Sequence, residues 1–257
     1  MELSITEINA WVGSFLWPFL RISAMFISAP IFASRMMPLK VRLLLSLLLS
    51  LMIEPMILSV PALEPLSPEG LLISAHQVLI GLGMGFILQL IFSAFALAGE
   101  VVSMSMGLGF ASMIDPQNGV QIPVLSSYYV VLVTLIFLAL NGHLSLIVMI
   151  MESFQTLPIG VHGVGVEGVW QIVAWASAMF SGAVLVALPA LISLLMVNLA
   201  FSMMTRTAPQ LNIFAVGFPM TLMLGFIFIL FSVPALEPQV SRLLTEGYEL
   251  MSQILGR

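Results

Sequence analysis

The chain has 257 residues, of which 60% are hydrophobic and only 7% are charged, and its formal net charge is −5. Soluble domains carry about 25% charged residues, so this composition excludes an ordinary soluble enzyme and, even more firmly, a disordered chain. The sequence has no cysteine, which excludes disulfides and thiolate chemistry. Its few scattered basic residues argue against nucleic-acid binding. We therefore expect a protein surrounded by lipid, or by an assembly that replaces lipid.

Six hydrophobic segments follow one another along the chain. A membrane-spanning helix needs about 20 apolar residues, and the segments cover about 8–33, about 41–60, 70–99, 116–151, 168–205 and 207–236. The first carries Arg21, the second carries Glu54, and the others carry no charged residue. A membrane β-barrel would alternate apolar and polar residues in short segments, and no such alternation is present. The sequence predicts an all-α integral membrane protein of about six kinked helices.

The charged residues between the segments predict an orientation. Arg35, Lys40 and Arg42 lie between the first two segments and Arg206 lies before the sixth, whereas the other connections are acidic. Cytoplasmic loops are enriched in Lys and Arg, so these two connections are expected in the cytoplasm and both termini outside. The chain begins with acidic residues, so the first segment is expected to remain in the mature protein rather than act as a signal peptide.

Several local patterns indicate broken and closely packed helices. The heptapeptide Ser-Val-Pro-Ala-Leu-Glu-Pro occurs at 59–65 and again at 232–238, where its two prolines are expected to stop a helix. Duplication and convergence on a good helix stop explain the repeat equally well. Gly81 and Gly85 share one helix face and permit a close approach. Further breaks are expected at prolines within or beside the apolar runs: Pro18, Pro30, Pro55, Pro189 and Pro219.

The inventory of reactive residues excludes the common intramembrane enzymes. Asp115 is the only aspartate, whereas an aspartyl protease needs two. The three histidines lack metalloprotease spacing, and Lys40, the only lysine, is not part of a P-loop. We predict no catalytic residue, cofactor or metal site. Arg21 is expected to pair structurally rather than line a polar path, and His143 is expected to mark a helix bend rather than a proton relay.

The stretch 100–123 is apolar but too broken for a clean span. Glycines loosen its first half, and Asp-Pro-Gln-Asn-Gly at 115–119 is a turn signal. Methionines surround Phe110, and flexible methionine side chains can form a soft seal. Two interpretations stay open on these grounds: a re-entrant loop that plugs a pore, or an interfacial loop with a short amphipathic helix.

Two motifs resemble those of the FliR family of flagellar export-gate proteins, which has SctT-type relatives in virulence secretion. The first is Met106-Gly-Leu-Gly-Phe-Ala-Ser-Met-Ile-Asp-Pro-Gln-Asn-Gly119. The second begins at Asn198-Leu-Ala-Phe, continues as Arg206-Thr-Ala-Pro-Gln-Leu-Asn-Ile-Phe214 and is followed by Gly217-Phe-Pro219. The resemblance covers essentially the whole chain.

The resemblance implies a non-enzymatic, single-copy subunit that joins FliP and FliQ in a helical export gate of the bacterial inner membrane. FlhB and FlhA would be further partners, and unfolded flagellar subunits would pass through the channel, part of which is raised toward the periplasm. The implied plug residues are Met104, Met106, Gly107, Gly109, Phe110, Met113, Asp115, Pro116 and Gly119. The residues implied at the cytoplasmic entrance, near FliQ and FlhB, are Arg206, Pro209, Gln210 and Asn212.

The resemblance also implies four parts: FliP-like helices over 1–99, the plug loop over 100–123, a central helix and outward loop over 124–168, and a FliQ-like hairpin and tail over 169–257. The alternative function is a secondary transporter with broken helices. A transporter would need coupling carboxylates at depth, and the apolar runs offer only Glu54.

Overall fold

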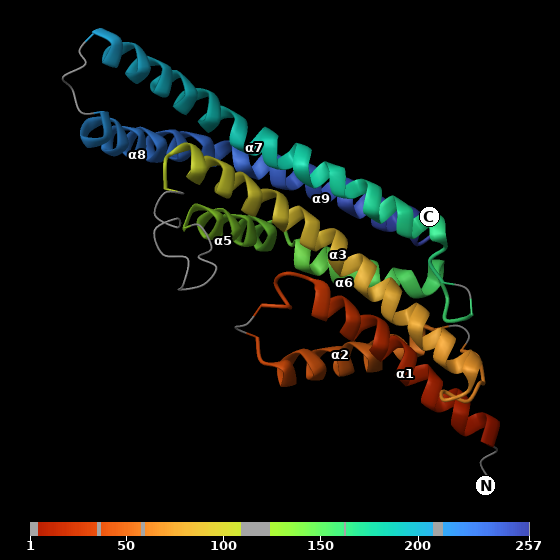
Figure 1. The fold of residues 1–257 in the computed structure, drawn as a ribbon. Coiled ribbons are helices and arrows are strands. Elements are labelled where there is room, and N and C mark those ends of the chain that lie inside the picture. Colours follow the sequence, from red (N-terminus) through yellow and green to blue (C-terminus); the bar gives the residue numbers. More distant parts are fainter. Residues whose placement is uncertain are drawn as a thin grey trace, which may run out of the picture. The chain divides into compact units, whose positions relative to one another are not determined.

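The computed structural model describes residues 5–34, 37–57, 60–108, 124–161, 163–207 and 213–256, and its regular secondary structure there is helical. The α-helices are α1 (Ile5–Ser28), α2 (Leu39–Ile53), α3 (Pro68–Ser105), α5 (Val124–Ala139), α6 (Gly142–Thr156), α7 (Val166–Thr207), α8 (Ile213–Ser232) and α9 (Leu236–Ile254) (Figure 1). The prediction of an all-α membrane protein is confirmed.

The number of candidate membrane spans is lower than the six predicted. Among the described residues, four helical stretches are long and apolar enough to cross a membrane: Asn9–Ser28, Pro68–Ser105, Val166–Thr207 and Gly217–Ile254. The bent pair α5–α6 makes a fifth if it counts as one span. The second hydrophobic segment fails because α2 has only 15 residues. At 1.5 Å per residue α2 is about 22 Å long, which is shorter than the apolar layer of a bilayer.

The chain forms two compact units. Unit 1 contains residues 1–90, 141–176 and 244–257, and unit 2 contains residues 91–140 and 177–243. The boundaries fall inside α3, α7 and α9, so each long helix contributes one part of its length to each core. The four-part division that the resemblance implies stays a prediction.

In unit 1, α1 packs beside α2 and against α3. Figure 1 shows α1 and α2 running side by side. The predicted glycine pair lies where α3 meets α1. A Cβ at Gly81 would collide with the backbone of Arg21, and one at Gly85 would lie 2.8 Å from the backbone nitrogen of Ala29. Only glycine permits this separation of the two helices, so the predicted close approach is confirmed.

The repeated heptapeptide behaves differently at its two positions. The described residues of the first copy, 60–65, run through a non-helical connection before α3. The second copy does not stop the helical run: Ser232 ends α8, Val233–Ala235 forms a 3-10 turn, and α9 follows at once. The prediction of a helix stop there was wrong. Pro238 lies in the first turn of α9, where its missing N–H would have had no helical partner.

In unit 2, α3 packs closely against α5. The rings of Phe92 and Phe137 meet edge to face with centroids 5.7 Å apart, and the Ser126 hydroxyl donates a 2.7 Å hydrogen bond to the Ala96 carbonyl. A Cβ at Gly99 would lie 2.7 Å from the carbonyl oxygen of Leu125. These contacts position the C-terminal end of α3, where the first family-like motif begins.

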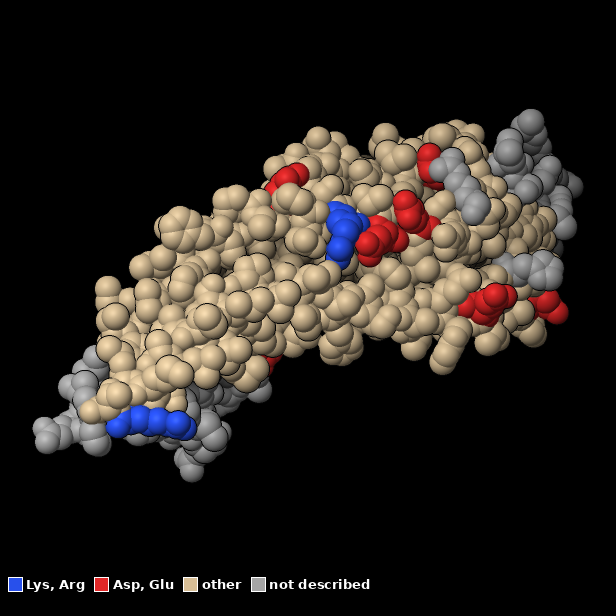
Figure 2. Space-filling view, turned by 90° about the horizontal axis from the view of Figure 1, so that it is seen from above, with Lys and Arg blue, Asp and Glu red and all other residues tan. Residues whose placement is uncertain are grey.

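The surface of the protein carries few charges. Figure 2 shows a face on which Lys, Arg, Asp and Glu occupy a small share of the surface among uncharged residues. Many large apolar side chains are exposed, and α7 is the clearest case because only 22% of its most apolar stretch is buried, against 61% in α3. Such a surface requires lipid or other protein around it.

Candidate functional site

The first family-like motif begins at the C-terminal end of α3, where a glycine turn redirects the chain. Gly107 has φ +84°, a conformation that glycine adopts without the strain of a side chain. Its N–H donates to the Met104 carbonyl at 3.0 Å, and the Leu108 N–H donates to the Ser103 carbonyl at 3.1 Å. This pair of bonds is the Schellman helix ending. The glycine at position 107 thus ends α3 in a defined turn, after which residues 109–123 follow.

A cavity of about 780 Å³ in unit 2 lies directly at this helix end. Three segments wall it: the end of α3, the last three turns of α7 and the N-terminal half of α8. These are the segments that carry the two family-like motifs, so residues about a hundred positions apart meet here. The lining residues are Met104, Ser105, Met106, Gly107, Asn198, Phe201, Ser202, Thr205, Gly217, Phe218 and Thr221.

The two methionines of this cavity have different environments. Met106 is completely buried, whereas 56% of the Met104 side chain is exposed. Met106 packs against α8 at Gly225, where an added Cβ would lie 2.6 Å from its Cγ and Cε atoms. Gly225 therefore makes room for the methionine, and Met106 anchors the end of α3 to α8 while Met104 stays available at the wall.

The cavity wall is neutral and of mixed polarity. The Thr221 hydroxyl donates to the Phe218 carbonyl at 3.0 Å, Thr205 donates to the Ser202 carbonyl at 2.8 Å, and Ser105 donates to the Val101 carbonyl at 2.9 Å. Each of these hydroxyls keeps acceptor capacity toward the cavity. None of the lining residues that the structure describes is titratable, so these residues offer no general base or activated nucleophile.

The structure brings together some of the predicted plug residues. Met104, Met106 and Gly107 all line the cavity. Arg206 lies in the last turn of α7, exposed and outside the lining. The other predicted plug and entrance residues lie outside the described residues: Gly109, Phe110, Met113, Asp115, Pro116, Gly119, Pro209, Gln210 and Asn212.

Sequence reasoning missed much of the cavity wall on α7 and α8. Asn198, Phe201, Ser202 and Thr205 follow a spacing of three and four residues, which places them on one helix face. The sequence could have indicated this wall, because the polar residues Asn198, Ser202 and Thr205 recur at a spacing of three and four inside an apolar run. For Thr221 the sequence offers no comparable pattern.

Arg21 forms a second, internal cluster in unit 1. Its side chain is completely buried, and its Nε donates to Gln77 Oε1 at 2.8 Å. One terminal nitrogen donates to both the carbonyl and the hydroxyl of Ser153, and the other donates to the Leu157 carbonyl, all at 2.9 Å. The guanidinium also lies over the Phe154 ring, with Cζ 4.2 Å from the centroid.

The acceptors explain how an arginine is tolerated inside an apolar helix. Ser153 and Leu157 lie at the C-terminal end of α6, where the helix dipole is negative. The Ser153 carbonyl also accepts the Leu157 N–H at 3.0 Å, whereas Leu157 follows the last residue of the helix. Arg21 therefore caps α6. The predicted structural pairing is confirmed, but its partners are carbonyls, a serine hydroxyl and an amide oxygen.

The predicted bend at His143 is also confirmed. Asn141 has φ +55°, the left-handed conformation that asparagine tolerates better than most residues. It separates α5 from α6, and its carbonyl accepts the first amide hydrogen bonds of α6, from Leu144 at 2.9 Å and Ser145 at 3.1 Å. His143 thus belongs to the first turn after a helix break.

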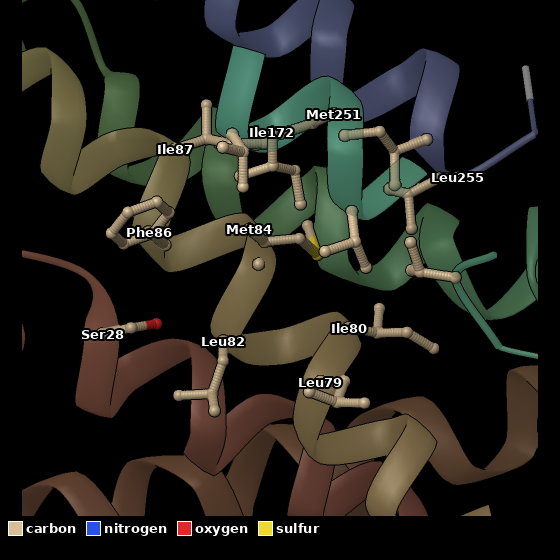
Figure 3. Close-up of a pocket in the computed structure, with 15 residues that line it drawn as sticks. Ser28, Leu79, Ile80, Leu82, Met84, Phe86, Ile87, Ile172, Met251 and Leu255 are labelled. Atoms are coloured by element: carbon tan, nitrogen blue, oxygen red, sulfur yellow. The ribbon is translucent and has the colours of Figure 1, made fainter. Parts of the chain in front are cut away.

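An apolar pocket of about 420 Å³ lies elsewhere in unit 1 (Figure 3). Side chains of α3, α7 and α9 surround it, among them Met84, Ile172 and Met251. Ser28 is the one polar residue among the lining residues that the structure describes, and its hydroxyl is already bonded to the carbonyls of its own helix. The motif segments meet at the unit 2 cavity instead, so that cavity is the candidate functional site.

The described helices and their exposed apolar surface define an integral membrane protein. The sequence profile described as "Bacterial export proteins, family 1" matches residues 12–247. The flagellar biosynthetic protein FliR of Escherichia coli (strain K12) is 36% identical over 100% of this chain and 98% of its own length. FliR of Pectobacterium carotovorum subsp. carotovorum is also 36% identical, over 95% of this chain and 94% of its own. FliR of Bacillus subtilis (strain 168) is 31% identical over 95% of each.

The chain therefore belongs to this family of bacterial export proteins, alongside the FliR proteins. As a member of an export family it is a membrane transport component and not an enzyme.

Proposed function

We propose that this chain is a single-copy core subunit of the flagellar type III export gate, where it forms part of the channel for unfolded flagellar subunits and part of its plug. One observation carries the proposal: the two motif segments that resemble the FliR signatures meet at one neutral cavity in unit 2. A wall of methionine, phenylalanine, hydroxyl and amide groups suits unfolded chains, whose side chains vary in polarity.

The plug is proposed to be the segment 109–123, which begins one residue after the described end of the α3 turn. Two backbone hydrogen bonds hold the turn at Gly107, which lines the cavity. The proposed plug therefore follows directly on a fixed turn at the cavity wall. Methionine and glycine residues within it make a deformable apolar closure, and an apolar constriction excludes ions by dewetting. The transporter alternative would need coupling carboxylates, and none is among the cavity-lining residues that the structure describes.

The proposed partners are FliP and FliQ within the gate, with FlhB and FlhA as further partners. The loop around Arg206 would lie at the cytoplasmic entrance, near FliQ and FlhB. The exposed apolar surface of α7 supports an assembly, since such a surface is suited to packing on neighbouring helices. In this proposal residues 1–99 are the FliP-like part and 169–257 the FliQ-like part. The gate belongs to the flagellar basal body in the inner membrane, with part of its helices raised toward the periplasm.

Shortening the plug tests this proposal. Deleting residues 110–118 from the chain within the whole gate is expected to leave assembly intact but to make cells permeable to small ions. A same-length Gly/Ser replacement of 110–118 separates loss of length from loss of the apolar seal, and should also leak. The control is Gly165→Ala, because a Cβ at Gly165 meets open space. Unchanged conductance in normally assembled deletion gates would contradict the plug.

A further inference from the structure

A third pocket, of about 430 Å³, lies in the α1–α2 hairpin of unit 1. Most of its described wall is apolar or aromatic, and one carboxylate among the described residues, that of Glu54, closes one side. The residues around it are Trp11, Val12, Ser14, Phe15, Leu16, Leu51 and Glu54. The pocket lies outside the candidate functional site, and the proposed function assigns it no role.

Glu54 has no cation of its own among the described residues of unit 1. Its Oε1 accepts only a long 3.5 Å hydrogen bond from the Ser14 hydroxyl. Arg21 is engaged at the end of α6, and Arg42 donates to the carbonyls of Ser34 and Met37. Arg42 also lies twelve residues before Glu54 along α2, about 18 Å away at 1.5 Å per residue. A half-buried carboxylate among apolar groups is costly unless a cation accompanies it.

The aromatic part of the pocket is suited to a cation. Trp11 is 75% exposed, so a large indole face stands free beside the carboxylate. Indole is the strongest natural aromatic partner for a cation. Tryptophan and arginine are also the residues that most often dominate the binding energy of protein interfaces.

An apolar stripe on α2 runs toward the same pocket. It consists of the exposed side chains Leu44, Leu48, Leu51, Met52 and Met56. Their spacing of three and four residues places them along one side of the helix and its 3-10 extension. A helix laid along this stripe would bring a side chain into the pocket at the stripe's end.

We infer that the Trp11–Glu54 pocket receives an arginine or lysine side chain from a helix of a neighbouring subunit, which packs on the leucine-methionine stripe of α2. The cation pairs with Glu54 and lies on the face of Trp11, while the partner helix covers the stripe. This inference rests on the proposed function, because it requires a hetero-oligomer. Charge complementarity selects a basic side chain, and the exposed apolar side chains beside the pocket give the partner helix a surface to pack on.

Photo-crosslinking within the assembled gate tests the occupant. A benzophenone amino acid replaces Met52, which is 67% exposed on the stripe and does not line the pocket. We expect a crosslink to one subunit, at a peptide that contains an arginine or lysine. A crosslink to lipid alone, or to a peptide without a basic residue, would overturn the inference.

Charge exchange tests the ion pair. Glu54→Lys is expected to lower co-purification of the gate subunits by about tenfold or more, because two cations then face each other. Glu54→Asp should retain most of it, and Glu69→Lys, which changes an exposed carboxylate outside the pocket, should have no effect. Changing the crosslinked basic residue to Glu should restore assembly with Glu54→Lys.

The outcomes separate this inference from the proposed function. If the unsubstituted chain purifies without any other gate subunit, both fail. If the gate assembles and Glu54→Lys co-purifies like the unsubstituted chain, only the inference fails. If Glu54→Lys does not accumulate, Glu54→Gln in the crosslinking background decides, since loss of the crosslink supports the ion pair and an unchanged yield contradicts it.

Discussion

Arg21 offers the sharpest stability prediction. Arg21→Met keeps much of the apolar length of the side chain but removes four hydrogen bonds and the contact with Phe154. The Leu157 carbonyl then loses its Arg21 donor, and the Ser153 carbonyl keeps its helical bond from the Leu157 N–H. An unsatisfied buried polar group costs about 1–3 kcal/mol, and a hydrogen bond to a charged group contributes about 1.5–3 kcal/mol. We therefore expect a loss of about 3–5 kcal/mol of unfolding free energy.

Two further variants isolate the reason for the loss. Arg21→Lys keeps a positive charge but lacks the planar fork that reaches three residues at once, so it should recover only part of the stability. Lys40→Met removes an exposed cation and should change stability by less than about 0.5 kcal/mol.

The measurement is the thermal unfolding midpoint of the purified protein in mild detergent, followed by tryptophan fluorescence. Trp17 is a suitable reporter because it is completely buried in unit 1 and its Nε1 donates to the Ser74 hydroxyl at 3.2 Å. For a protein of this size, 3–5 kcal/mol corresponds to a decrease of roughly 6–20 °C. An Arg21→Met midpoint within about 2 °C of the unsubstituted protein would refute the capping role.

Three other substitutions test local packing by the same melting measurement. Gly85→Ala places a Cβ 2.8 Å from the Met25 carbonyl oxygen and the Ala29 nitrogen and should cost about 1–3 kcal/mol of unfolding free energy. Gly83→Ala is its control: the added Cβ meets only the end of the Ile172 side chain, at 3.2 Å, and the change should be neutral or stabilising. Gly107→Ala puts a side chain at φ +84° and should cost about 1 kcal/mol; an unchanged midpoint would argue against the turn. Tyr248→Phe removes a 2.8 Å hydrogen bond to the Gly142 carbonyl and should cost about 0.5–1.5 kcal/mol; a loss outside that range would argue against this hydrogen bond.

The sequence predicted the features that depend on local chemistry. The apolar runs predicted the helices, the Gly81–Gly85 spacing predicted a close approach to a neighbour, and Asn141-Gly-His143 predicted a break. The predictions were wrong where hydropathy alone was used to infer the length or the end of a helix. The run at 41–60 looked like a span, but α2 ends at Ile53. The second heptapeptide looked like a helix stop, yet its prolines occupy positions that a helix start tolerates.

The candidate site could be predicted only in part. The motif at 106–119 pointed to the end of α3, because glycine and methionine residues in a broken apolar stretch are locally recognisable. The α7 and α8 walls of the cavity depend on contacts between distant segments, which composition and spacing do not specify. The acceptors of Arg21 were missed for the same reason: a helix end becomes an arginine partner only through tertiary packing.

Membership of a hetero-oligomeric export gate is the central claim of this account, and native mass spectrometry of the complex purified in mild detergent tests it most directly. The account predicts a stable particle that contains one copy of this chain and several copies of other gate subunits. A stable monomer as the only species, from cells that produce the whole set of export proteins, would contradict it.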